Sequence, residues 1–306
     1  MGNKIIKKKY VFLGDTNSIN IEIVEKSFYK LKRKNITYII IGNKKELIRY
    51  LVKIKSKIQV YEIIDPFNFD NCKNNFLNIF NVENISTKKY KNLLNQIKIA
   101  NYLSNKSKID LVTMPINKSI FKKEIKFIGM TEYLGKLNKT KTMMIMYGEK
   151  FSIIPYTTHI NPKDIHSFIK LKYLNQFIKL LLKFLKRKDY AMDFKYIKFI
   201  CYNPHCGEES TLGEEDVIIT NIIKRNKMIL GPFPADSAFT NLKKKTLYIS
   251  TYHDQALIPF KLLNRKGLNI TLGLKYKRLS PAHGTASDKK YKSISDNTSY
   301  LECMQI

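Results

Sequence analysis

Short runs of β-branched and aromatic residues alternate with helical patterns near the start of the chain. The runs occupy residues 9–14, 36–42 and 58–65, and the helical patterns occupy residues 21–33 and 44–55. Strands that alternate with helices in this way form βαβ units, whose strands run parallel in one sheet. The sequence therefore predicts an α/β fold with a largely parallel sheet.

The same alternation continues further along the chain. A longer helix is expected around residues 87–103, and the apolar run at residues 109–114 is expected to be a strand that ends in a polar turn. Between residues 162 and 186 apolar side chains recur at helical spacing, which predicts one helix. His166 would lie on that helix as a surface or capping residue.

Three of the five histidines stand in short polar motifs that follow predicted strands. Each comes a few residues after a β-rich run: His159 after residues 151–155, His205 after residues 196–201 and His253 after residues 246–249. Open α/β sheets hold ligands at the carboxyl ends of their strands, so three strands would deliver three imidazoles there. Neutral imidazole binds zinc, manganese or ferrous ions, while an acceptor such as Asp254 or Glu208 can orient the ring. Three separate hydrogen-bonded histidines are the alternative, but the repeated context favours a metal site.

A second group of polar residues follows His253. Lys261, Asn269 and Arg278 combine a point charge, an amide and a planar fork, which together suit a phosphate or carboxylate. For Lys261 alone, a solvated basic surface is the simpler interpretation. Asp236 lies in a proline-containing turn, where it would either cap a following helix or orient a ligand or base near the metal.

Composition limits the possible partners and compartments. The net charge of +30 suggests nucleic-acid binding, but the lysines are spread through nearly every segment, so no specific nucleic-acid partner is expected. The four cysteines have no CxxC or disulfide-like spacing. No signal peptide and no apolar run long enough to span a membrane is found. We therefore expect a cytoplasmic protein without a membrane partner.

Seven short motifs follow one another along the chain. They are Met-Pro-Ile-Asn-Lys at residues 114–118, Gly-Met-Thr-Glu at 129–132, Thr-Thr-His-Ile at 157–160, Asn-Pro-His-Cys-Gly-Glu at 203–208, Gly-Pro-Phe-Pro-Ala-Asp at 231–236, Tyr-His-Asp-Gln at 252–255 and His-Gly-Thr-Ala at 283–286. In this order they resemble the 4-hydroxythreonine-4-phosphate dehydrogenase family of pyridoxal phosphate biosynthesis. Seven ordered motifs are far more specific than any single signature.

The resemblance implies a three-layer α/β/α fold of the isocitrate and isopropylmalate dehydrogenase type. Residues 1–306 would form a single dehydrogenase unit, with two intertwined α/β subdomains and a cleft between them. A homodimer with its active site at the subunit interface is also implied. The implied reaction is the NAD-dependent oxidation of 4-phosphohydroxy-L-threonine, followed by decarboxylation to 3-amino-2-oxopropyl phosphate, with NADP as the alternative cofactor.

The resemblance also implies roles for individual residues. One divalent ion per subunit, which could be zinc, magnesium, cobalt or manganese, would be held by His159, His205 and His253. Substrate binding falls to Met130, Thr131, Lys261, Asn269 and Arg278. Catalysis would involve Asp236 and Lys261. Cofactor binding falls to His283, Gly284, Thr285 and Ala286.

The sequence departs from the family pattern at several places. The turn at residues 14–22 lacks two glycines and both prolines of the family, and Met130 stands where the family has a histidine. These departures leave two alternatives open. The protein could be a related dehydrogenase for another phosphorylated hydroxy acid, such as phosphorylated threonate or erythronate, or a decayed homologue without catalytic activity.

Overall fold

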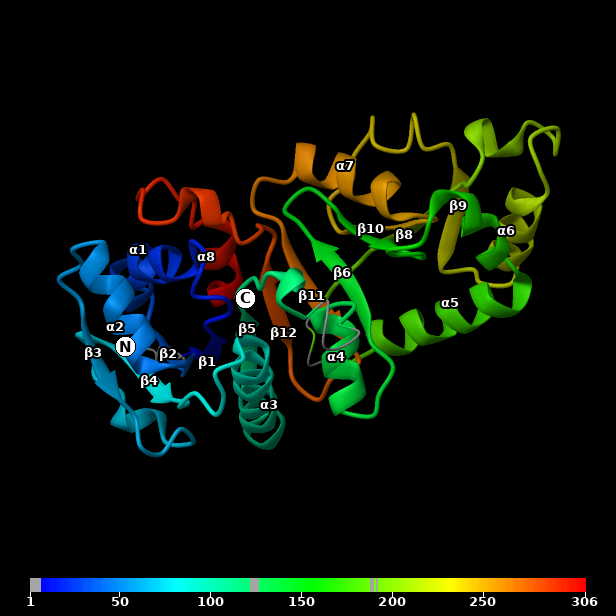
Figure 1. Cartoon of the computed structure of the whole chain (residues 1–306). Helices are drawn as coiled ribbons and strands as arrows, with labels where there is room; N and C mark the ends of the chain where they lie inside the picture. The colour runs from blue at the N-terminus through cyan, green and yellow to red at the C-terminus, as the bar shows by residue number, and fades with distance from the viewer. Residues whose placement is uncertain (1–6, 122–126, 188–189, 191) are drawn as a thin grey trace, which may run out of the picture. The chain divides into compact units, whose positions relative to one another are not determined.

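The computed structural model describes residues 7–121, 127–187, 190 and 192–306. The chain divides into two compact units, of which the first combines Met1–Thr142 with Leu268–Ile306 and the second comprises Met143–Gly267. Each unit contains a β-sheet flanked by helices (Figure 1). The predicted α/β fold is therefore confirmed.

The first unit contains a mostly parallel sheet. Its strands are β1 (Lys7–Phe12), β2 (Ile36–Gly42), β3 (Gln59–Glu62), β4 (Phe76–Asn81), β5 (Asp110–Thr113), β11 (Leu268–Leu272) and β12 (Arg278–Pro281). They lie in the order β3-β4-β2-β1-β5-β12-β11. All neighbours run parallel except β11 and β12, which are antiparallel. The runs of Ile and Val fit this position because helices cover both faces of a parallel sheet.

The helices of the first unit lie on both faces of its sheet. In Figure 1, α1 (Asn20–Arg33), α2 (Lys44–Lys53) and α8 (Thr298–Gln305) lie on one face, and α3 (Lys89–Ser107) lies on the other. Right-handed crossovers require this arrangement, because the chain moves toward one edge through β1 and β2 and returns through α3 to β5. A shorter helix, α4, spans Met130–Leu137.

Local sequence explains where some of these helices begin and what they bury. The Asn43 side chain accepts a hydrogen bond of 3.1 Å from the Glu46 amide, which caps α2 at its first turn. Tyr10, Ile39 and Leu111 belong to the apolar core cluster of this unit and are at most 1% exposed. The pattern of β-branched residues therefore translates directly into a packed core.

The strands of the second unit lie in the order β6-β7-β10-β8-β9. Its strands are β6 (Met143–Tyr147), β7 (Ser152–Pro155), β8 (Tyr196–Ile200), β9 (Ile229–Phe233) and β10 (Thr246–Ser250). Only β6 is antiparallel to its neighbour. Figure 1 shows α5 (Leu171–Leu185) and α6 (Glu215–Lys224) on one face and α7 (His253–Leu263) on the other. The core beneath α7 contains the buried rings of Phe151, Tyr248 and Phe260.

The expectation of one continuous helix over residues 162–186 is wrong. Pro162–Phe168 forms a 3-10 helix, and α5 begins only at Leu171, after an extended residue at Lys170 with ψ of 141°. The Tyr156 hydroxyl donates a hydrogen bond of 2.7 Å to the Phe168 carbonyl, an acceptor that a continuous α-helix would use for itself. His166 is exposed on the 3-10 helix, as expected of a surface residue.

None of the described helices is long and apolar enough to cross a membrane.

Candidate functional site

The three motif histidines follow three neighbouring strands of the second unit. β10 lies between β7 and β8 and is parallel to both, so the carboxyl ends of all three strands meet at one edge of the sheet. His159 follows β7, His205 lies in the 3-10 helix Pro204–Gly207 after β8, and His253 is the first residue of α7 after β10. This edge is where open α/β sheets hold ligands, as the sequence predicts.

Two of the three imidazoles lie close together. The ring centroids of His159 and His253 are 5.8 Å apart, with an angle of 37° between the ring planes. Nδ1 of His253 lies 2.6 Å from Oδ1 of Asp254. With the proton on Nδ1, the imidazole donates to Asp254 and leaves Nε2 as a free electron pair for a metal ion. Asp254 therefore has the orienting position that the sequence predicts for it.

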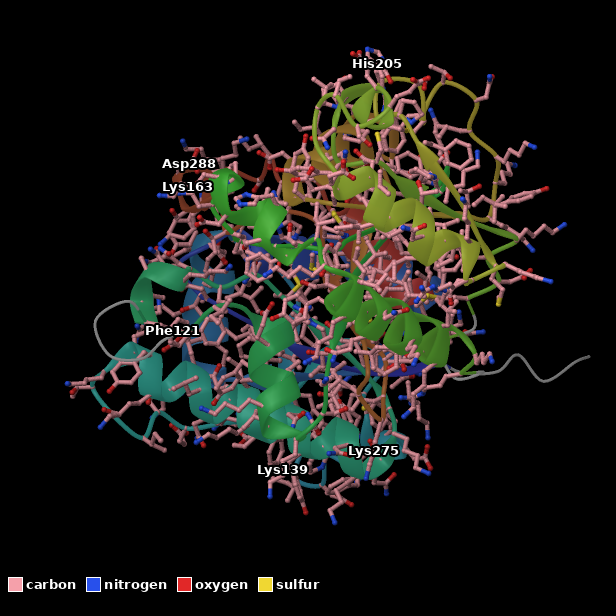
Figure 2. All side chains as sticks on the ribbon, turned by 90° about the vertical axis from the view of Figure 1, so that its right-hand side faces the viewer. Phe121, Lys139, Lys163, His205, Lys275 and Asp288 are labelled. Atoms are coloured by element: carbon pink, nitrogen blue, oxygen red, sulfur yellow. The ribbon has the colours of Figure 1, made fainter. Side chains whose placement is uncertain are left out.

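The third imidazole lies beside a carboxylate. Nδ1 of His205 is 3.8 Å from Oδ2 of Asp236, and the His205 side chain is 62% exposed. The labelled His205 in Figure 2 points outward from the ribbon. Within the described part of the chain, no three His, Cys, Asp or Glu side chains are grouped closely enough to hold a metal ion. The structure thus pairs His159 with His253 and places His205 next to Asp236.

Two acidic residues correct or extend the prediction around His205. No helix begins in the residues that follow Asp236, so the interpretation of Asp236 as a helix cap is wrong. Asp216, which sequence reasoning does not single out, accepts hydrogen bonds from the amides of Tyr202 at 2.7 Å and Asn203 at 2.8 Å. It thereby fixes the segment that leads into His205. The only sequence signal for it is its place in the acidic first turn of α6.

Arg278 is a buried cation in the first unit. Arg278 is only 6% exposed, and its Nε donates a hydrogen bond of 2.8 Å to the Thr113 hydroxyl. A terminal nitrogen donates to the hydroxyls of Thr271 at 3.1 Å and Thr131 at 3.5 Å. No carboxylate pairs with Arg278 among the residues that the structure describes.

The surroundings of Arg278 favour an anionic ligand. Burial lowers the pKa of the guanidinium to about 10, so the group stays charged at neutral pH. A buried charge without a counter-charge is costly, and hydroxyl groups compensate only part of that cost. A phosphate or carboxylate group would supply the missing charge and match the planar fork. Thr131, a predicted substrate residue, is one of the threonines around Arg278. Thr113 is another, and no sequence motif singles it out.

The other predicted substrate residues have different surroundings. The Oδ1 atom of Asn269, on β11, is buried and has no hydrogen-bond partner in the part of the chain that the structure describes, so it can accept a hydrogen bond from a ligand. Met130 packs in the apolar cluster of the first unit and is 9% exposed. Lys261 is exposed on α7 in the second unit. A contact of Met130 or Lys261 with substrate stays a prediction.

The two imidazole nitrogens of His283 have different surroundings. Nδ1 lies 2.8 Å from the Gly284 carbonyl, and Nε2 is buried with no hydrogen-bond partner among the described residues. Burial lowers the pKa of His283, so the ring is neutral at neutral pH and Nε2 is an acceptor. A ribose hydroxyl or the carboxamide of a nicotinamide cofactor carries donors that fit this acceptor.

The turn at residues 14–22 retains a defined structure despite its altered sequence. Gly14 has φ of +76°, and a Cβ atom there would lie 2.5 Å from the Pro115 carbonyl oxygen, so only glycine fits. The side-chain Nδ2 of Asn20 donates hydrogen bonds to the carbonyls of Leu13 at 3.0 Å and Pro115 at 2.9 Å. The Ile19 amide donates 3.1 Å to the Thr285 carbonyl, which ties the turn to the His283–Ala286 loop.

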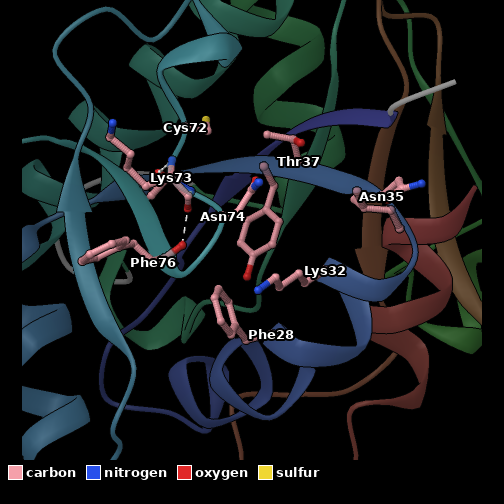
Figure 3. A pocket seen from close by; sticks show the side chains of 11 residues that line it. Phe28, Lys32, Asn35, Thr37, Cys72, Lys73, Asn74 and Phe76 are labelled. Atoms are coloured by element: carbon pink, nitrogen blue, oxygen red, sulfur yellow. Dashed lines mark hydrogen bonds between the residues drawn. The ribbon is translucent and has the colours of Figure 1, made fainter. Parts of the chain in front are cut away.

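A separate pocket of about 300 Å³ lies in the first unit (Figure 3). Its lining combines Phe28 and Phe76 with polar residues such as Lys32 and Asn74. None of the predicted site residues lines this pocket. It is therefore distinct from the candidate site.

The second unit has paired imidazoles at a strand edge, and the first unit has a buried arginine with no carboxylate partner among the described residues. Both features are typical of α/β enzymes that act on small anionic substrates. A profile of the family described as pyridoxal phosphate biosynthetic protein PdxA matches residues 34–306. The chain belongs to this family, as its ordered motifs predict.

Similar proteins extend this result to the whole chain. The 4-hydroxythreonine-4-phosphate dehydrogenase of Aquifex aeolicus is 32% identical over 98% of this chain and 97% of its own length. The enzyme of the same name from a Sulfurihydrogenibium species is also 32% identical, over 98% of this chain and 97% of its own. A solved structure of 4-hydroxythreonine-4-phosphate dehydrogenase from Klebsiella pneumoniae covers 98% of both chains, with 25% identity and a TM-score of 0.81.

Proposed function

We propose that this protein is a 4-hydroxythreonine-4-phosphate dehydrogenase. It oxidises the hydroxyl group of 4-phosphohydroxy-L-threonine by hydride transfer to a nicotinamide cofactor. The resulting 3-oxo acid loses CO₂ and becomes 3-amino-2-oxopropyl phosphate. The observation that carries the proposal is the buried Arg278, which has threonine hydroxyls around it and no carboxylate partner in the described structure.

Substrate binding rests on charge and on hydrogen bonds. Arg278, supported by Thr131, binds an anionic group of the substrate, and Oδ1 of Asn269 accepts from a donor such as the substrate amine or hydroxyl. Lys261 contributes a further positive charge. A substrate that is held at several points loses less orientational entropy when it reaches the reactive geometry.

The imidazoles of His159, His205 and His253 would hold one divalent ion, and Asp254 orients the ring of His253. The His205 side chain is 62% exposed. Such an ion would supply Lewis-acid chemistry, which would stabilise negative charge on the substrate oxygen. Asp236, beside His205, is the carboxylate that accepts the proton of the substrate hydroxyl. Zinc, magnesium, cobalt and manganese all remain candidates.

The loop from His283 to Ala286 binds the nicotinamide cofactor in this proposal. The buried Nε2 of His283, which has no partner among the described residues, accepts a hydrogen bond from the cofactor. The hydrogen bond from Ile19 to Thr285 holds the loop in place.

The direct test is a substrate panel with purified full-length protein. Reduced cofactor should form with 4-phosphohydroxy-L-threonine, and 3-amino-2-oxopropyl phosphate should be detected by mass spectrometry. Phosphorylated threonate and erythronate serve as comparisons, because Met130 changes a family substrate position. Rapid turnover of one of these with none of 4-phosphohydroxy-L-threonine would establish the related dehydrogenase instead. No turnover of any substrate, together with no bound metal, would establish the decayed homologue.

An exposed apolar surface on α7 supports a homodimer. Ile258 is 59% and Leu262 77% exposed, and both line a pocket of about 470 Å³ together with Phe239 and Pro259. Asp236 and Asp254 border the same pocket, so the apolar surface adjoins the residues beside His205 and His253. Exposed apolar surface of this kind marks interaction sites. In our proposal a second copy of the chain covers it and places the site at the interface.

Leu262→Lys is expected to convert the dimer into a monomer, because a lysine at the centre of an apolar interface loses its hydration. Size-exclusion chromatography with light scattering measures the mass. Val52→Lys is the matched control, since Val52 is 69% exposed on α2 in the first unit, and it should leave the dimer intact. A Leu262→Lys protein that remains dimeric would refute this interface.

A further inference from the structure

A second pocket in the first unit is lined by cations. It has a volume of about 450 Å³ and adjoins the turn at residues 14–22. Arg49, Lys53, Lys89 and Lys290 line it, and the rest of the lining is rich in hydroxyl and amide groups: Thr16, Asn17, Asn84, Ser86, Thr87, Asn92 and Gln96. Cations and neutral hydrogen-bond donors in one concave surface suit a phosphate group.

Most of these cations have no counter-charge. Lys89 pairs with the buried Asp15 at 2.5 Å. Arg49, Lys53 and Lys290 form no ion pair with a carboxylate in the portion of the chain that the structure describes. Three positive charges around one pocket repel each other, and a bound anion relieves that repulsion.

Glu46 is the acidic residue in the lining, and its carboxylate is already engaged. One oxygen accepts a hydrogen bond of 2.8 Å from Thr16, and the other accepts from Asn84 at 3.2 Å. Glu46 forms no ion pair with a lining cation in the described structure, and its single negative charge leaves the pocket with an excess of positive charge.

An aromatic ring holds two of the lysines in place. Nζ of Lys290 lies 4.7 Å and Nζ of Lys53 lies 5.2 Å from the Tyr291 ring centroid. The Tyr291 ring packs against Tyr50 at 4.6 Å, and the Tyr50 hydroxyl donates 2.8 Å to the Ser18 carbonyl. Cation–π contacts thus favour positions of both ammonium groups beside the pocket before any ligand binds.

The pocket adjoins the loop that is proposed to bind the nicotinamide cofactor. Lys290 and Tyr291 follow the His283–Ala286 loop closely in sequence, and the hydrogen bond from Ile19 to Thr285 joins that loop to the 14–22 turn. NADP differs from NAD only by a phosphate monoester on the 2′-oxygen of the adenosine ribose. Dinucleotide sites for NAD place an acidic residue on that ribose, whereas a cation accommodates the phosphate in sites for NADP.

We propose that this pocket is the site of the NADP 2′-phosphate and that the protein selects NADP over NAD. Arg49, Lys53 and Lys290 supply the charge, and the side-chain NH₂ group of Asn17 supplies hydrogen bonds. The proposal deepens the function given above, and it rests on that function for the place of the cofactor loop.

Equilibrium binding to the full-length protein tests this selectivity without turnover. Isothermal titration calorimetry should give a dissociation constant for NADP roughly 10- to 100-fold below that for NAD, which corresponds to about 1.4–2.8 kcal/mol. Adenosine 2′,5′-bisphosphate should likewise bind more tightly than adenosine 5′-diphosphate. These two fragments each carry two phosphates, so nonspecific attraction to a protein of net charge +30 largely cancels between them.

Variants identify the residues responsible. The double variant Lys53→Ala/Lys290→Ala should reduce the preference for NADP to a few-fold and leave the affinity for NAD unchanged, which also shows that the variant is folded. Lys106→Ala is the matched control, because Lys106 also lies over a tyrosine ring, 6.0 Å from the Tyr102 centroid, outside the pocket. The control should retain the full preference.

Several results would overturn the proposal. They are equal affinity for NADP and NAD, an equal loss of preference in the Lys106→Ala control, or tighter binding of NAD through Glu46. The outcome is separable from the proposed function. Turnover of 4-phosphohydroxy-L-threonine with equal use of both cofactors removes the selectivity and keeps the function. Selective binding of adenosine 2′,5′-bisphosphate without turnover of any substrate keeps the phosphate site and removes the proposed function.

Discussion

Replacing His253 by alanine is expected to abolish stoichiometric binding of a divalent metal and to lower kcat/KM by about 10³-fold. His253 forms half of the imidazole pair, with its ring 5.8 Å from that of His159. Lewis-acid stabilisation of developing negative charge contributes several kcal/mol, and each 1.36 kcal/mol changes the rate about tenfold. The fold should survive, because the His253 side chain is 40% exposed. Metal analysis of the purified protein and steady-state kinetics measure the two effects.

Two further variants test whether the loss of metal is specific to His253. Asp254→Asn keeps the imidazole but weakens the acceptor that orients it, so metal affinity should fall by about 10- to 100-fold rather than vanish. His166→Ala removes an exposed histidine of the 3-10 helix and should leave metal content and activity unchanged. A His253→Ala protein with wild-type metal content and kcat/KM would contradict the proposed metal site.

The alternation of strands and helices is readable from the sequence because it depends on local periodicity. The run at residues 36–42 coincides with β2, and the helical pattern at residues 44–55 contains α2. The order of the strands cannot be predicted from local periodicity, because strand pairing joins residues that are distant in the chain. β10 inserts between β7 and β8 although it follows both in sequence. Only this insertion brings the strand end that precedes His253 next to the one that precedes His159.

Tertiary contacts explain where the periodicity misleads. Apolar residues recur regularly from Ile165 to Leu185, yet the segment is interrupted before α5. At the interruption the Phe168 carbonyl accepts hydrogen bonds from the Tyr156 hydroxyl and the Lys170 amide. A pattern of apolar residues records which side is buried, and it contains no information about such a competing hydrogen bond.

In the candidate site, too, some features can be predicted from the sequence and others are visible only in the structure. The chemistry of Arg278 and Asn269 is evident from residue type, because a guanidinium and an amide suit an anionic substrate. The absence of a carboxylate partner for Arg278 in the described structure is visible only in three dimensions. Its neighbours Thr113 and Thr271 lie on β5 and β11, far apart in the sequence.

Replacing Arg278 by methionine should lower kcat/KM by about 10²–10³-fold, mainly through a higher KM. Removing one partner of a buried ionic contact costs roughly 2–5 kcal/mol, and this loss arises only when the substrate anion is bound. Arg278→Lys keeps the charge but loses the planar fork that donates to Thr113 and Thr271, so an intermediate loss is expected. Lys275→Met is the control, because Lys275 is exposed on the turn between β11 and β12 (Figure 2).

The stability of the same variant separates a binding role from a structural one. In the substrate-free protein Arg278 is a buried cation without a carboxylate partner in the described residues, and an apolar side chain of similar length removes its desolvation cost. The free energy of unfolding of Arg278→Met, measured by urea denaturation, should therefore stay level or rise while activity falls. A large loss of stability with a normal KM would instead show that Arg278 holds β12 to its threonine neighbours and does not bind the substrate. Because the two roles predict opposite changes in stability, one denaturation curve beside one kinetic series distinguishes them.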